Sequence, residues 1–85
     1  MASYKLRIKP SAVKELEAVP ARDRRKVAAK IQVLAEDPRP GGSEKLSGQE
    51  RYRLRQGDYR VVYAIDDEER TVLVVKIGNR RDIYR

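Results

Sequence analysis

Arginine occupies every second position in one short stretch of this chain, where Arg51, Arg53 and Arg55 alternate with Tyr52 and Leu54. Side chains two residues apart on an extended strand share a face, so we expect the three arginines to project together. A row of guanidinium groups repels itself. The pattern therefore indicates an anionic partner, although a solvated strand face or an acidic protein partner would also satisfy it.

A second predicted strand follows and carries Arg60 between Tyr59 and Val61. Tyr59 and Tyr63 share strand parity with Val61, which favours core packing for both rings. Arg60 lies on the opposite face, where packing explains a charged side chain poorly. We therefore interpret Arg60 as a functional residue.

Arginine and tyrosine together suit the cleavage of RNA without a metal. In that reaction the nucleophile is the 2′-hydroxyl of the RNA, so the protein positions it, neutralises charge on the phosphorane and assists proton transfer. A guanidinium group donates two hydrogen bonds to phosphate oxygens, and a tyrosine ring stacks on an unpaired base. Arginine is a poor general base because its pKa is above about 12. Such catalysis would depend on positioning and electrostatics.

The composition narrows the kinds of site that this chain can build. Histidine and cysteine are both absent, which removes the commonest general base and the commonest transition-metal ligands. Asp58 and Asp82 are isolated carboxylates near the arginines, whereas a two-metal nuclease needs several convergent carboxylates. We expect neither a metal nor another cofactor, and we expect these two carboxylates to pair with neighbouring arginines.

The net charge favours a polyanionic partner. The chain carries 20 basic against 13 acidic side chains, a formal charge of +7, and such an excess attracts polyanions by steering and counterion release. No apolar run approaches the ~20 residues that span a bilayer, and the N-terminus lacks an apolar secretion segment. We expect a cytoplasmic protein that forms one domain over residues 1–85, without a membrane partner.

The apolar pattern predicts an α+β fold with the element order β-α-α-β-β-β. Two short helices, separated at Pro20, form a hairpin that packs on a small and mostly antiparallel sheet. Val72 to Val75 form a continuous apolar run, which predicts a central strand covered on both faces. Asp37–Ser43 is a loop by composition, and Asp66–Glu69 is expected to be a solvated turn. The expected elements are a strand over 4–8, helices over 10–19 and 22–35, and strands over 51–55, 59–65 and 71–77.

Several motifs follow one another in a fixed order, and together they resemble the RelE/ParE toxin superfamily. With the β-α-α order before them, the resemblance covers nearly the whole chain. The YR-V-Y strand and the closing RRD-Y are its most specific parts. It implies the toxin of a type II toxin–antitoxin system, nearest to the RelE-like mRNA interferase branch. The motifs are Leu46-Ser47-Gly48, Tyr52-Arg53-Leu54-Arg55, Gly57-Asp58-Tyr59-Arg60-Val61-Val62-Tyr63 and Gly78-Asn79-Arg80-Arg81-Asp82-Ile83-Tyr84.

The resemblance also implies roles for individual residues. RelE-like toxins enter the ribosomal A site and cleave the mRNA codon there without metal, by attack of the 2′-hydroxyl. Carried over, Arg60 and Arg80 would stabilise the phosphate in the transition state, and Tyr84 would stack on or orient the scissile nucleotide. Arg53 and Arg55 would hold the backbone and complete the predicted catalytic set. The further RNA contacts that we predict are Lys45, Arg51, Arg81 and Arg85.

Two features set the chain apart from well-studied relatives. Arg53 and Arg55 replace lysines, one of which serves as a base in some relatives, and Asn79 replaces a common histidine. The partners that the resemblance implies are a cognate acidic antitoxin, the 70S ribosome with its mRNA, and operator DNA reached only through the antitoxin. Two other functions stay open: a ParE-like inhibitor of DNA gyrase, and a nucleic-acid-binding module without catalysis. Tyr84 also fits a terminal plug on the sheet edge.

Overall fold

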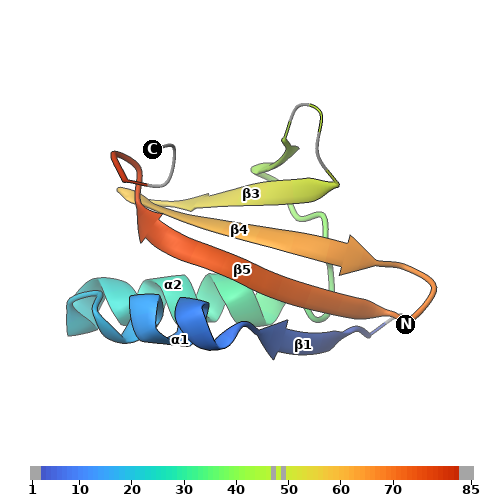
Figure 1. Cartoon of the computed structure of the whole chain (residues 1–85), viewed down its shortest axis with the longest axis horizontal. Coiled ribbons are helices and arrows are strands. Elements are labelled where there is room, and N and C mark those ends of the chain that lie inside the picture. The colour runs from blue at the N-terminus through green and yellow to red at the C-terminus, as the bar shows by residue number, and fades with distance from the viewer. Residues whose placement is uncertain (1–2, 47, 49, 83–85) are drawn as a thin grey trace.

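The computed structural model describes residues 3–46, 48 and 50–82, and it consists of two helices on one face of a five-stranded sheet (Figure 1). This arrangement confirms the predicted α+β class. No helix of the described residues covers the other face of the sheet. The elements are β1 Lys5–Ile8, α1 Pro10–Glu17, α2 Ala21–Val33, β2 Ser43–Lys45, β3 Arg51–Gln56, β4 Tyr59–Asp66 and β5 Thr71–Asn79.

The strands lie in the order β1-β5-β4-β3-β2. β1 runs parallel to β5, and the other neighbouring pairs are antiparallel, as the predicted meander requires. β2 is an addition to the predicted element order. It begins at the last residue of the expected loop and has only three residues, and so short a strand leaves no periodic signal. Its pairing gives β3 a neighbouring strand on each side.

Proline marks the start of both helices. Pro10 occupies the first turn of α1, where its missing N–H has no intrahelical partner to lose, and Pro20 immediately precedes α2. α2 ends at Val33 rather than at residue 35, but Leu34 is still fully buried. In the described part of the chain, no helix has the length and apolar character needed to cross a membrane.

The core lies between the helices and the inner face of the sheet. Alternation along β3 and β4 turns Leu54, Val61 and Tyr63 inward, and all three are almost completely buried. The Tyr63 hydroxyl donates to the carbonyl of Pro38 at 2.8 Å, which satisfies the phenol in the core, and burial raises the pKa of Tyr63. Tyr59 packs against the same cluster, so the predicted core role of both tyrosines is confirmed.

β5 departs from the predicted pattern at a β-bulge. The register with β4 shifts by one residue next to Tyr63, so Val75 is the extra residue, and Val74 and Ile77 both belong to the core. Leu73 is 36% exposed, so the prediction of a strand covered on both faces is wrong. The bulge accounts for Val75 in the apolar run, whereas Leu73 precedes the bulge and is an apolar residue on the outer face of the sheet.

α1 covers the edge of β5 beyond the end of β1. β1 pairs with β5 only as far as Val74, and past that point the N–H of Ile77 donates to Oε1 of Glu15 on α1 at 3.1 Å. This bond satisfies a strand N–H that β1 does not reach. It also ties the C-terminal part of β5, which leads to Arg80, to the helix layer.

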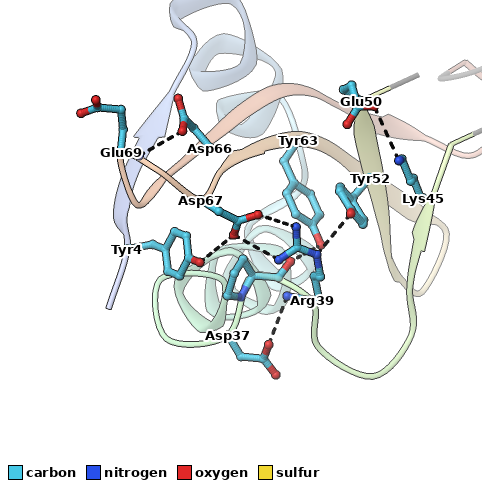
Figure 2. A network of polar contacts seen from close by, with 11 residues as sticks. Tyr4, Asp37, Arg39, Lys45, Glu50, Tyr52, Tyr63, Asp66, Asp67 and Glu69 are labelled. Atoms are coloured by element: carbon cyan, nitrogen blue, oxygen red, sulfur yellow. Dashed lines mark hydrogen bonds and ion pairs between the residues drawn. The ribbon is translucent and has the colours of Figure 1, made fainter. Parts of the chain in front are cut away.

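A polar network closes the end of the sheet at which β4 passes into β5 (Figure 2). Arg39 donates to the two carboxylate oxygens of Asp67 at 2.9 and 3.2 Å, and Tyr4 donates to Asp67 at 2.7 Å. Arg39 also donates to the Tyr52 hydroxyl at 3.2 Å and lies 5.3 Å from the centre of that ring. The predicted solvated turn is confirmed, because Asp66 to Glu69 are all exposed, and Asp67 in addition pairs with Arg39.

Hydrogen bonding sets the ionisation of this network. The bonds from Arg39, and then the bond from Tyr4, hold the pKa of Asp67 below its ordinary value. The bond to Asp67 raises the pKa of Tyr4 and is also the main cause of a raised pKa of Arg39. The charges therefore persist at neutral pH. They join three segments that lie far apart in the sequence: the residue before β1, the loop after α2 and the β4–β5 turn.

Candidate active site

The tight turn between β3 and β4 organises the candidate site. Gly57 has a φ of 57°, a left-handed conformation that glycine adopts without strain. The turn lets Gln56 and Tyr59 pair across the hairpin, and the same register sets Arg55 opposite Arg60. Arginines from both strands therefore meet beside the turn.

Arg60 is held against this turn by its own guanidinium group. The residue is only 7% exposed, and Nη1 donates to the carbonyl oxygens of Gly57 and Tyr59 at 2.9 Å each. Its partner across the strand pair is Gly78, which has no side chain to compete for the space. These bonds give Arg60 a structural role that strand parity did not reveal. Its role at a phosphate stays a prediction.

Arg80 reaches the same turn from the end of β5. Its backbone N–H donates to the carbonyl of Asp58 at 2.8 Å, and its Nε lies 3.9 Å from Oδ1 of Asp58. The predicted pairing of Asp58 with a neighbouring arginine is thereby confirmed. The side-chain oxygen of Asn79 then accepts the N–H of Arg81 at 3.1 Å and turns the chain. A polar depression of about 480 Å³ lies here, lined by Asp58, Asn79, Arg80, Arg81 and Asp82.

The predicted arginine row follows β3 away from this turn. Arg51, Arg53 and Arg55 alternate with Leu54, which is buried on the helix side, so the arginines lie on the outer face. At ~3.3 Å per residue, Arg51 is about 13 Å further along the strand than Arg55. Arg53 lies between them and forms an ion pair with Glu44 on β2. The row therefore extends the positive surface rather than gathering at one point.

Some of the predicted RNA contacts lie apart from this surface. Lys45 stands opposite Tyr52 in the register of β2 with β3, hence on the helix side of the sheet edge. Its Nζ lies 3.6 Å from Oε1 of Glu50. This position separates Lys45 from the arginine row. Tyr84 and Arg85 lie outside the described residues, so their roles stay predictions.

Glu44 and the backbone of the turn are the parts of the site that sequence reasoning missed. Glu44 precedes every motif, and it comes next to Arg53 only because β2 pairs with β3. The carbonyls of Gly57 and Tyr59 that bind Arg60 leave no mark in a side-chain pattern. Within residues 3–46, 48 and 50–82, no three acidic side chains lie close enough together to hold a metal ion.

A family profile identifies the kind of protein that carries this site. The profile described as "ParE toxin of type II toxin-antitoxin system, parDE" matches residues 6–84. The chain belongs to the RelE/ParE toxin superfamily. This result confirms the assignment made from the ordered motifs, and it covers the turn and both arginines that converge on it.

Solved RelE-family toxins share the fold along nearly their whole length. In the archaeal RelE–RelB complex from Pyrococcus horikoshii, the matching chain is 28% identical with a TM-score of 0.83, over 94% of this chain and 98% of that one. In the RelBE2 complex from Mycobacterium tuberculosis, the matching chain is 27% identical with a TM-score of 0.81, over 92% of this chain and 99% of that one. In the intact RelBE complex from E. coli, the matching chain is 31% identical with a TM-score of 0.77, over 91% of this chain and 96% of that one. The chain is thus a RelE-family toxin of the type II class.

A curated relative shares a shorter stretch. Toxin RelG from Mycobacterium tuberculosis is 47% identical to this chain over 34 residues. That stretch makes up 40% of this chain and 39% of RelG, so the match spans less than half of either protein. This short match agrees with the family profile, which extends over residues 6–84.

Proposed function

We propose that this RelE-family toxin is a ribosome-dependent mRNA endonuclease that cleaves codons in the A site without a metal ion. The RNA supplies the nucleophile, its own 2′-hydroxyl, and cleavage stops translation. The toxin contributes position and positive charge, which are the two things that its arginine-rich surface offers.

The observation that carries the proposal is that Arg55, Arg60 and Arg80 all lie beside one turn. Arg55 and Arg60 are cross-strand partners, and Arg80 is tied to the Asp58 carbonyl at the tip of the same hairpin. Donors fixed in advance around a developing negative charge each contribute about 10²–10³-fold to a rate. Charge developing on a phosphorane is the form of negative charge that guanidinium groups suit best.

The two arginines nearest the turn differ in what they offer to a phosphate. The Arg80 side chain is 57% exposed and lines the polar depression, so it is placed to bind a phosphate oxygen directly. Arg60 is buried and uses Nη1 to hold the turn. It fixes the geometry of the hairpin and offers the rest of its guanidinium group to the substrate.

The remaining predicted residues would bind the mRNA around this point. Arg53 and Arg51 would follow the phosphate backbone along the outer face of β3, and Arg81 would do so from the depression beside the turn. Tyr84 would stack on or orient the scissile nucleotide, because it comes soon after the turn that carries Arg81.

The solved relatives named above are complexes with RelB-type antitoxins, and we extend that type of partner to this chain. A net charge of +7 suits an acidic antitoxin segment that folds as it covers the arginines. In this proposal the toxin reaches operator DNA only through the antitoxin, and it acts in the cytoplasm, where translating ribosomes are found.

Mapping mRNA ends by primer extension after induction in cells tests this function. We expect breaks in phase with codons on translated messages and none on messages that are not translated. Intact messages together with double-strand DNA breaks would instead identify an inhibitor of DNA gyrase, the second candidate, which the ParE description of the family profile favours. Intact messages and intact DNA would leave only nucleic-acid binding without catalysis.

A further inference from the structure

The arginines of the candidate site leave the proton of the attacking hydroxyl without an acceptor. Arginine keeps its own proton below about pH 12, and the chain contains no histidine. Attack by a 2′-hydroxyl is faster when a positioned group removes its proton in the transition state. Lysine and tyrosine carry a proton at neutral pH, whereas carboxylates do not, so carboxylates are the side chains that can accept a proton without first losing one.

Glu44 is a carboxylate that lies within the arginine row. The register of β2 with β3 sets it opposite Arg53, and its Oε2 accepts a hydrogen bond from Nη2 of Arg53. Residues i and i+2 of a strand are about 6.6 Å apart, so Arg51 and Arg55 are the next arginines on this face, and Arg55 is the one nearer the turn. The Glu44 side chain is 62% exposed. RNA lying along the row can therefore reach it.

The other carboxylates near the row are placed differently. Asp58 lies in the turn and contacts Arg80, the residue that we expect to bind the phosphate. Glu50 contacts Lys45, which lies on the helix side of the sheet edge. Glu44 lies on the same face as the arginine row. It is also far enough from the turn to leave room for a ribose beside a phosphate bound there.

We propose that Glu44 is the general base of the cleavage reaction, an inference that rests on the proposed function. The Glu44 carboxylate accepts the proton as the O–H bond of the 2′-hydroxyl breaks, and the 2′-oxygen forms a bond to the adjacent phosphorus. The bond from phosphorus to the 5′-oxygen then breaks, and water protonates the departing oxygen. The products are a 2′,3′-cyclic phosphate and a 5′-hydroxyl, and Glu44 returns its proton to water without any oxidation or reduction.

Arg53 gives this base its position. Its bond to Oε2 fixes the direction of the carboxylate and leaves Oε1 for the ribose. The charged groups nearest to the pair on this face are Arg51 and Arg55 on β3 and, one strand further, Arg60 on β4. β2 is the edge strand of the described sheet.

Single-turnover cleavage of mRNA on programmed ribosomes tests the proposal. We expect Glu44→Gln to lower the rate by about 10²–10⁴-fold, with little change in ribosome affinity or in melting temperature, because the residue is exposed. Glu50→Gln is the matched control and should keep the wild-type rate. If the wild type cleaves and Glu44→Gln cleaves equally fast, the base assignment is wrong while the function stands. If the wild type does not cleave, the function itself is wrong.

A pH profile and a double variant separate a base from a residue that only positions Arg53. Between about pH 6 and pH 8.5 the wild-type rate should change little, whereas the rate of Glu44→Gln should rise about tenfold per pH unit as hydroxide takes over the proton transfer. Glu44→Gln should also slow the Arg53→Ala variant further. No additional loss in that background would mean that Glu44 acts only through Arg53, and would overturn the proposal.

Discussion

The two ends of the sheet use arginine in opposite ways. At the β4–β5 end, each of the three guanidinium nitrogens of Arg39 donates to Asp67 or to the Tyr52 hydroxyl (Figure 2). At the β3–β4 end, Arg60 and Arg80 lie beside the turn, and Asp58 is paired with Arg80 only at 3.9 Å. An arginine that is paired in this way stabilises the fold and offers little to a ligand. Arginines that outnumber their acidic partners retain affinity for an anion.

This contrast shows why arginine content alone does not locate a functional site. Arg39 and Arg80 are both about half exposed, at 46% and 57%, and both lie beside a carboxylate. They differ in geometry: Arg39 makes two short bonds to Asp67, whereas Nε of Arg80 lies 3.9 Å from Asp58. The looser contact is the one that a phosphate can replace.

The largest effect is expected from Arg80→Ala at the β3–β4 end. Loss of a preorganised cation should lower codon cleavage by about 10²–10³-fold and abolish growth arrest, while antitoxin binding by calorimetry stays measurable. The melting temperature should change little, because the backbone bond to Asp58 remains. Arg25→Ala on the exposed face of α2 is the control. Wild-type toxicity of Arg80→Ala would remove this residue from the mechanism.

Arg60→Ala should lower both activity and stability. The substitution removes the growth arrest and leaves the carbonyls of Gly57 and Tyr59 without their donor, which we expect to cost about 2 kcal/mol. Urea denaturation measures the loss of stability. Arg60→Lys should recover part of it, because a single lysine nitrogen can still donate to these carbonyls. Unchanged stability of Arg60→Ala would mean that the turn does not depend on these bonds.

Arg39→Ala should do the reverse of Arg80→Ala. Loss of the contacts with Asp67 and with the Tyr52 ring should cost about 1 kcal/mol and lower the melting temperature by about 4–8 °C. The rate of codon cleavage by the folded protein should stay within about twofold of wild type. A large loss of cleavage without loss of stability would show that the two ends of the sheet are not separate in function.

The smallest effect is expected from the pH dependence of Asp67. Because the folded state lowers the pKa of Asp67, its charged form stabilises the fold above the ordinary value of about 3.9, and this contribution is lost as the pH falls through the lower folded value. Asp67→Asn should therefore melt below the wild type at neutral pH. The difference in melting temperature should shrink as the pH of the melts is lowered below the ordinary pKa of aspartate. A difference that persists there would have a cause other than ionisation.

Periodic segments were predictable from the sequence, and the contacts between them were not. The alternation around Leu54 and Val61 located β3 and β4, and Pro20 separated the helices. β2 is too short for alternation, and the bulge at Val75 depends on how β5 pairs with β4. The secondary structure could thus be predicted from the local sequence pattern, whereas the register between strands could be seen only in the folded sheet.

For the candidate site as well, the sequence identified individual residues but not the contacts that they make. Strand parity placed Arg60 outside the apolar pattern of Val61, but its bonds to turn carbonyls depend on backbone geometry. The motifs identified Arg80, and its approach to Asp58 follows from the end of β5 meeting the hairpin. Glu44 was missed because its significance comes entirely from pairing across to Arg53.

The decisive measurement is the cleavage rate of an mRNA whose A-site codon carries a single 2′-deoxynucleotide at the scissile position. On purified ribosomes, we expect the chain to cut the all-ribose message and to leave a 5′-hydroxyl fragment. The deoxy-substituted message should stay intact, because it lacks the nucleophile. Equal cutting of both messages would contradict cleavage by 2′-hydroxyl attack at the arginine-rich turn.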